Sequence, residues 1–248
     1  MSTKSSINAI ELEKFSKISS QWWQEGGEFK MLHQINPLRL SYIMDKMKNH
    51  FNPNNKMAIN ILDVGCGGGL VTSGICKLNT MPTNEYNITG IDAIQDNIDV
   101  AIKHAEEQNL NIKYSKSTIE ELVLSDNKQY DVVLCLEVLE HIDNLDDFVK
   151  NLANITKPNG IIIISTINRT IKSYMLAILM AEYVLGWVPQ KTHDYSKFLQ
   201  PSEIYSRFSK NNVLLKELKG LTYNIITRTW QLSRDIDVNY FAYLTKKI

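Results

Sequence analysis

The chain has little cysteine and no long apolar run, and its charges cancel. Its three cysteines, Cys66, Cys76 and Cys135, match no metal-binding spacing and are typical of a reducing compartment. No run of 18 apolar residues occurs, so no membrane-spanning helix is expected. The first 15 residues include Glu11 and Glu13 and lack an apolar core, so we expect no signal peptide and predict a cytoplasmic protein. Lys+Arg and Asp+Glu both number 27, and this zero net charge gives no indication of nucleic-acid binding.

Glycine, although sparse overall, gathers in one stretch around which the chain is organised. Residues 57–64 are mostly apolar and predict a buried strand, and Gly65, Gly67, Gly68 and Gly69 follow at once. Residues 70–78 then repeat apolar side chains at helical spacing. A sharp glycine turn that opens onto a helix N-terminus is suited to a carboxylate or phosphate, because backbone N–H groups are free there.

The spacing of these glycines distinguishes between two nucleotide ligands. A dinucleotide fingerprint needs a sixth-position glycine, and this chain has Leu70 there. Asp-Val-Gly-Cys-Gly-Gly-Gly is instead similar to the first motif of class I S-adenosylmethionine (SAM) methyltransferases. A nicotinamide oxidoreductase is therefore disfavoured.

Strands and helices alternate along most of the chain, which predicts an α/β fold with a parallel sheet and right-handed crossovers. We expect the ligand beyond the strand C-termini, near the reversal of strand order. Strands are predicted at 57–64, 86–91, 111–115, 130–136, 161–165, 213–218 and 238–244; helices at 9–20, 38–48, 70–78, 94–108, 145–155 and 201–210; and a loop at 31–37.

One segment is too long for an ordinary connection. Residues 168–200 have an apolar centre at 174–188, which is too short to span a bilayer. With Arg169, Lys172 and Lys191 beside it, the segment is interpreted as a lid that docks on an anionic membrane surface; a lid that only closes over the sheet is the alternative. The single domain is divided into a helical cap (1–56), a core (57–166), this insertion (167–200) and the rest of the sheet (201–248).

Acidic residues follow two of the predicted strands. Asp92 ends the second strand, where a carboxylate can accept hydrogen bonds from both hydroxyls of a ribose; a helix N-cap is the alternative. Glu137, Glu140 and His141 follow the fourth strand at i, i+3 and i+4, so one helical turn would put them on one face. They could hold a divalent cation, His141 could act as a general base, or the acidic groups could serve only the helix dipole.

Several stretches together carry a resemblance to one family. They include Trp22-Trp23, the segment from Gly27 to Leu40, the glycine motif, Glu137-Val-Leu-Glu-His141 and Asp237-Val-Asn-Tyr240. From about Phe15 to its end, the chain resembles the bacterial ubiquinone biosynthesis O-methyltransferases. The glycine motif is shared by many methyltransferases, whereas the Trp-Trp segment and Asp237-Val-Asn-Tyr240 are specific to this family.

The resemblance implies a Rossmann-like class I methyltransferase fold with seven mostly parallel strands, the last antiparallel. It implies methylation of both ring hydroxyl sites of a polyprenylated phenol or catechol, on the inner face of the plasma membrane, with other proteins of the pathway as further partners. A methyltransferase of another small-molecule pathway is the alternative. The residues implied are Arg39, Gly65, Asp92 and Leu136 for SAM, with Asp63 and Gly67 from the same glycine motif, and Glu137, Glu140 and His141 for Mg²⁺ or Zn²⁺ and for catalysis.

Overall fold

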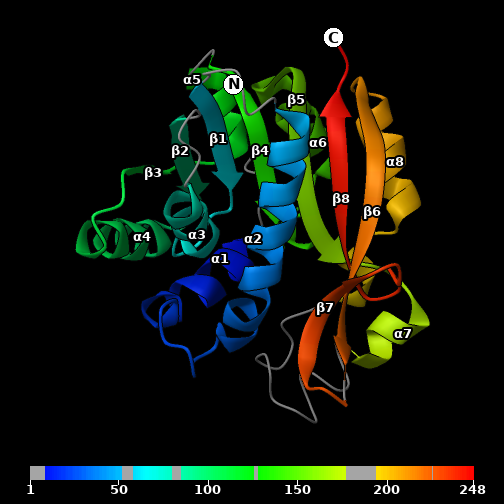
Figure 1. Cartoon of the computed structure of the whole chain (residues 1–248), viewed down its shortest axis with the longest axis horizontal. Helices are drawn as coiled ribbons and strands as arrows, with labels where there is room; N and C mark the ends of the chain where they lie inside the picture. Colours follow the sequence, from blue (N-terminus) through cyan, green and yellow to red (C-terminus); the bar gives the residue numbers. More distant parts are fainter. Residues whose placement is uncertain (1–8, 52–57, 80–84, 126–127, 177–193, 225) are drawn as a thin grey trace.

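The computed structural model describes residues 9–51, 58–79, 85–125, 128–176, 194–224 and 226–248. In these ranges one sheet of eight strands runs through the molecule in the order β3-β2-β1-β4-β5-β8-β6-β7 (Figure 1). The strands are β1 (Ala58–Val64), β2 (Glu85–Asp92), β3 (Ile112–Lys116), β4 (Tyr130–Leu136), β5 (Thr156–Ile167), β6 (Val213–Asn224), β7 (Thr229–Ser233) and β8 (Asn239–Lys246).

The first five strands are parallel, and β8 enters antiparallel between β5 and β6. This confirms the predicted parallel sheet with an antiparallel last strand. The prediction of seven strands was one too low, because β6 continues to Asn224 and turns back as β7 at the edge of the sheet. The reversal of strand order falls between β1 and β4, whose C-terminal ends therefore flank a crevice.

Helices cover both faces of the sheet. They are α1 (Ala9–Ser16), α2 (Lys30–His50), α3 (Leu70–Leu78), α4 (Gln95–Glu107), α5 (Ile119–Ser125), α6 (Leu145–Ile155), α7 (Ile171–Ser173) and α8 (Pro201–Ser209), with short 3-10 turns η1 (Ser19–Gln21), η2 (Leu139–His141) and η4 (Tyr195–Lys197). In Figure 1, α2 and α3 lie in front of the sheet, and α5, α6 and α8 lie behind it.

The core follows the period-two alternation of the strands. Ile61 and Val132 pack toward α2 and α3, whereas Leu62 and Val133 pack in a second cluster with α6 and α8. The strands of the parallel part are apolar on both sides because helices cover both faces, which is why the sequence showed them as continuous apolar runs.

The N-terminal helix pair differs from expectation. The predicted loop at 31–37 was wrong: α2 begins at Lys30 and carries Pro37 in its interior. Proline removes one backbone hydrogen bond there and costs about 3 kcal/mol in a helix interior. Burial of Ile35, Ile43 and Met47 against the sheet offsets that cost. The helix α5, between β3 and β4, was not predicted.

The apolar insertion lies mostly outside the described residues. Its centre at 174–188 is described only as far as Leu176, so the lid stays a prediction, as does the four-part division of the chain. Arg169 pairs with Glu203, and Lys172 pairs with Asp235 and Asp237, so both of these cations have carboxylate partners. Among the helices that the structure describes, none has the length and apolar composition that a membrane crossing requires.

Candidate active site

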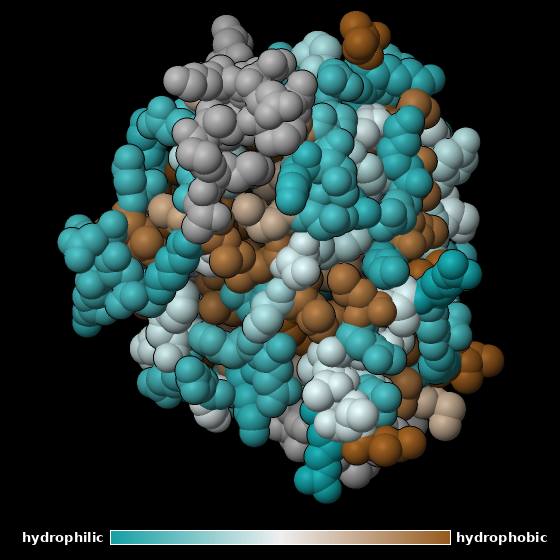
Figure 2. Space-filling view, in the orientation of Figure 1, coloured by the Kyte–Doolittle hydropathy of each residue, from teal (hydrophilic) through white to brown (hydrophobic). Residues whose placement is uncertain are grey.

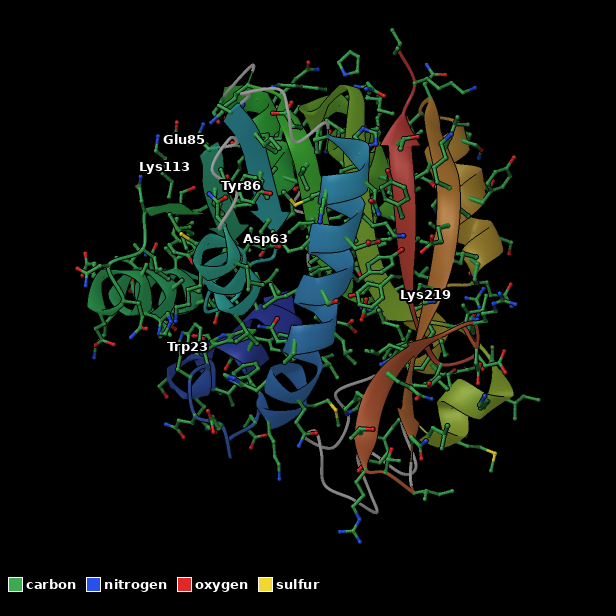
Figure 3. The ribbon with its side chains drawn as sticks, in the orientation of Figure 1. Trp23, Asp63, Glu85, Tyr86, Lys113 and Lys219 are labelled. Carbon is green, nitrogen blue, oxygen red and sulfur yellow. The ribbon has the colours of Figure 1, made fainter. Side chains whose placement is uncertain are left out.

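A cavity of about 790 Å³ opens at the C-terminal ends of β1, β2 and β4. Its lining follows the strand order of the sheet: Asp92 ends β2, Gly65 follows β1, Leu136 ends β4, and further lining residues come from β6 and β7. All nine side chains or glycines that the sequence singled out line this one cavity: Arg39, Asp63, Gly65, Gly67, Asp92, Leu136, Glu137, Glu140 and His141. Figure 3 labels Asp63 at the C-terminal end of β1.

The glycine turn after β1 adopts a conformation that favours glycine. Gly65, Gly67 and Gly69 have φ of 75°, 53° and 83°. A Cβ at Gly65 would lie 2.4 Å from a methyl of Val138 in the segment after β4, so β1 and β4 approach closely only because glycine is there. The N–H of Gly65 donates to the carbonyl of Ile91, which fixes the turn to the end of β2.

Asp92 holds the turn from the side of β2. Its Oδ2 accepts from the N–H of Gly67 at 2.9 Å, and its Oδ1 accepts from the N–H of Ile94 at 2.9 Å and from Asn97 Nδ2 at 3.2 Å. Burial raises the pKa of the Asp92 carboxyl, and the hydrogen bonds oppose that shift. The alternative prediction was that Asp92 serves as a helix N-cap. It is confirmed only in part, because Asp92 accepts a hydrogen bond from the N–H of Ile94, the residue just before α4.

A tryptophan pair covers the glycine turn. A Cβ at Gly67 would lie 2.2 Å from the Trp22 ring, which also stacks on Phe29 with ring centroids 3.8 Å apart. Trp23, labelled in Figure 3, donates its indole N–H to the carbonyl of Gly68 at 2.9 Å. The N-terminal segment is therefore part of the cavity wall.

Asn97 joins this cap to Asp92 and was missed in the sequence. Its Oδ1 accepts from Ser19 Oγ at 2.6 Å and Trp22 Nε1 at 2.9 Å, while its Nδ2 donates to Asp92. Asn97 is the third residue of α4, five positions after Asp92. An amide five positions after the acidic residue that ends β2 is the sequence feature that could have identified Asn97.

Arg39 reaches the cavity from α2. It is buried, and its Nη2 lies 3.0 Å from Glu137 Oε1. Arg39 Nε has no hydrogen-bond partner in the part of the chain described. Asp63 lies close enough for its pKa to respond: burial raises that pKa to about 7, Arg39 acts to lower it, and Asp92 acts to raise it. A buried guanidinium with spare N–H groups suits a ligand carboxylate.

The carboxylates after β4 are held by hydroxyls of β5. Ser165 Oγ donates to Glu137 Oε1 at 2.6 Å, and Thr166 Oγ1 donates to Glu140 Oε2 at 2.8 Å. Burial raises the pKa of Glu140 to about 7; the Glu137 charge adds to that shift and His141 opposes it. His141 has a less buried ring, whose edge meets Phe15. Glu140 can therefore exchange a proton near neutral pH.

The prediction that Glu137, Glu140 and His141 share one helical face was wrong. Glu137 has φ of 56° and precedes the 3-10 turn η2, which contains only Leu139–His141. Within the described ranges, no three Asp, Glu, His or Cys side chains form a group that could hold a metal ion. The arrangement therefore does not fit the predicted divalent cation; Arg39 and Ser165 instead contact one oxygen of Glu137, and Thr166 contacts one oxygen of Glu140.

The far end of the cavity is apolar and comes from elements that the sequence did not connect. Tyr223 on β6 pairs with Trp230 on β7, and both line the cavity together with Leu221 and Ile167. No strand was predicted at β7. An apolar chamber beside acidic and imidazole groups suits a ring with an apolar substituent.

Comparison with known proteins agrees with this geometry. Residues 31–214 match the family model described as "Methyltransferase domain". The magnesium protoporphyrin IX methyltransferase of Synechocystis, solved with bound SAH, covers 96% of this chain and 98% of its own, with TM-score 0.64 at 15% identity. A SAM-dependent methyltransferase from Thermotoga maritima covers 96% of this chain and all of its own, with TM-score 0.65 at 14% identity. Fold and site together define a SAM-dependent methyltransferase.

Relatives of higher sequence identity identify the family within the SAM-dependent methyltransferases. The chain is 56% identical over 245 residues to the ubiquinone biosynthesis O-methyltransferase of Rickettsia bellii, covering 98% of each chain. It is 53% identical to the Rickettsia typhi protein of the same name, over 98% of this chain and 95% of that one. The chain therefore belongs to the ubiquinone biosynthesis O-methyltransferases.

Proposed function

We propose that this protein transfers the methyl group of SAM to a ring hydroxyl of polyprenylated phenol and catechol intermediates, at both O-methylation steps of ubiquinone synthesis. One observation carries the proposal: a nucleoside-type end with Asp92, a carboxylate-binding Arg39 and an apolar end with acidic groups line one continuous cavity. A methyltransferase of another pathway is disfavoured by the full-length identity to proteins named for ubiquinone synthesis.

The chain's own residues account for cofactor binding. Arg39 binds the carboxylate of SAM through its spare N–H groups, and Asp92 accepts from the ribose hydroxyls. Gly65 and Gly67 let the turn adopt positive φ at the cavity wall, and Leu136 lines the cavity beside them. Asp63, at the end of β1, lies near enough for its pKa to be lowered by the Arg39 charge. Bound in this way, SAM supplies an electrophilic methyl group for in-line displacement by a phenolate oxygen.

The proton of the acceptor hydroxyl goes to the pair formed by Glu140 and His141. Glu140 has a pKa of about 7, so its carboxylate is both available and basic enough near neutral pH. Thr166 donates a hydrogen bond to the Glu140 carboxylate and so fixes its position. His141 follows Glu140 in the chain, and its ring contacts Phe15. Glu137, held by Ser165 and Arg39, orients the guanidinium and raises the pKa of Glu140 by its charge.

A divalent cation would change this assignment of the proton. Because no three ligand-type side chains form a group among the described residues, we derive no step through a metal. Turnover measured with and without a chelator distinguishes the two cases. If chelation stops turnover while SAM still binds, the three side chains rearrange around a cation; if the rate persists, the Glu140–His141 pair acts unaided.

We place the polyprenyl tail at a membrane surface near α7. Ile171 and Met175 are 79% and 53% exposed, and Leu176 lines the apolar end of the cavity. Figure 2 shows apolar atoms projecting at the lower right, where α7 lies in Figure 1. An enzyme that docks there avoids moving the whole tail into water.

Flotation with anionic liposomes tests this docking. The protein should float, and Ile171→Glu with Met175→Glu should stay at the bottom while still binding SAM. Leu124→Glu on α5 is the matched control, because Leu124 is 72% exposed on an element far from α7 in Figure 1. Leu179 and Trp187, also candidates for contact with lipid, lie outside the described residues.

The activity itself is tested with pure protein, SAM and a short-tailed polyprenyl catechol, with the methylated product followed by mass. Glu140→Gln should retain SAM binding and lose most turnover. Arg39→Met should lose SAM binding. Absence of methylated catechol from a protein that binds SAM would contradict the proposed acceptor.

A further inference from the structure

The apolar end of the cavity contains an amide that the proposed mechanism does not use. Asn239 is the first residue of β8 and belongs to the stretch Asp237-Val-Asn-Tyr240. It pairs with Ile167 on β5 and with Leu221 on β6, and directly paired residues of antiparallel strands share a face of the sheet. All three side chains line the cavity on the side of α2.

The amide oxygen of Asn239 is buried and has no hydrogen-bond partner among the described residues. Its paired neighbours on the same face, Ile167 and Leu221, are apolar and offer no donor side chain. Buried polar groups are nearly always satisfied, and an exception inside a cavity indicates a ligand. An amide oxygen only accepts, so the missing partner is a donor.

Strand β5 places this oxygen next to the reacting groups. Successive residues on the α2 side of β5 are Ser165 and Ile167, about 7 Å apart along the strand. Ser165, which binds Glu137, and Ile167, which lies opposite Asn239, share this side, whereas Thr166, which binds Glu140, faces the other side of the strand. The contact of Glu137 with β5 and the position of Asn239 are therefore about 7 Å apart along one face of the strand.

We propose that Asn239 is a specificity-determining residue that accepts a hydrogen bond from a second ring hydroxyl, next to the hydroxyl that is methylated. The inference rests on the proposed function and names the acceptor class: a ring with two hydroxyls. An acceptor whose second oxygen is already methylated leaves the amide unpaired and is a poorer substrate.

Paired acceptors test this assignment. One is a short-tailed catechol, and the other is its mono-methyl ether with a single free hydroxyl. The wild-type protein should favour the catechol in kcat/KM by roughly 10–100-fold, as expected where a buried polar group is left unpaired. Asn239→Leu should reduce this preference to near unity, mainly through the catechol, with unchanged SAM affinity. Asn239→Asp keeps the oxygen acceptors and should retain the preference.

Asn168→Leu is the matched control. Asn168 is also buried with an unpartnered amide oxygen, but it does not line the cavity. Its loss should lower stability without changing the catechol preference. If Asn239→Leu fails to fold, Asn239→Ser, whose hydroxyl is too short to reach the ring, should show the same loss.

The outcomes separate this inference from the proposed function. A catechol preference that survives in the Asn239 variants overturns the role of Asn239 while leaving the methyltransferase activity in place. A wild-type preference for the mono-methyl ether also overturns it, because the amide would then present its N–H group. If the wild-type protein binds SAM but methylates neither acceptor, both the proposed function and this inference fail.

Discussion

The link through Asn97 offers a test of how the N-terminal cap is joined to the cofactor site. Replacing Asn97 with Leu keeps a side chain of similar size and removes three hydrogen bonds, to Ser19, Trp22 and Asp92. The site is buried, so water does not readily replace the lost partners. We expect a loss of both stability and SAM affinity.

The structure sets the size of the effect. Ser19 Oγ can still donate to the carbonyl of Phe15 at 3.0 Å, so it adds little. The indole N–H of Trp22 loses its donor contact to Asn97, which costs about 1–3 kcal/mol when the group stays buried. Asp92 loses one of three hydrogen bonds, for roughly another 1 kcal/mol. A total of about 2–4 kcal/mol corresponds to a fall in Tm of roughly 4–16 °C for a chain of this size.

Thermal unfolding and calorimetric titration with SAM measure the two effects. Because Trp22 packs on Gly67, a loosened cap should also weaken SAM binding by roughly 5–30-fold, equivalent to about 1–2 kcal/mol. Gln95→Leu is the control on the same helix, since Gln95 is exposed and bonds only Asp99 nearby; its effect should stay within about 0.5 kcal/mol. A destabilised Asn97→Leu protein with unchanged SAM affinity would refute the coupling.

Three further predictions concern the ionisable groups of the cavity. The base form of Glu140 exists above its pKa of about 7, so kcat should rise with pH through about 7, and Glu140→Gln should abolish that rise in a pH–rate profile. The folded-state pKa of Asp63, about 7, lies above its ordinary 3.8, so its contribution to stability is complete below pH 4 and is lost as pH rises to 7. Asp63→Asn should therefore flatten the decline of Tm over that range, and an unchanged slope would contradict the burial argument. Glu137→Asn keeps a residue tolerant of φ 56° but removes the partner of Arg39, and we expect an unfolding free energy lower by roughly 3 kcal/mol in chemical denaturation.

The sequence by itself determined the parallel sheet and the cofactor end of the cavity. These features depend on local patterns: apolar runs such as 130–136 become buried strands, and four glycines after 57–64 permit one sharp turn. Because the C-terminal ends of parallel strands meet at one edge, Gly65, Asp92 and Glu137 were expected in one place, and all three line the cavity.

Only the tertiary structure decided the acceptor end and the state of its charged groups. Helical spacing put Glu137, Glu140 and His141 on one face, but close packing of Val138 on Gly65 accompanies a left-handed backbone at Glu137, which separates it from the turn. Residues 31–37 likewise form a helix because Ile35 is buried against the sheet, and this burial outweighs the cost of Pro37 in the helix interior. Asn239 pairs with strands 18 and 72 residues away along the chain, and periodicity within a short window carries no information about such long-range pairing.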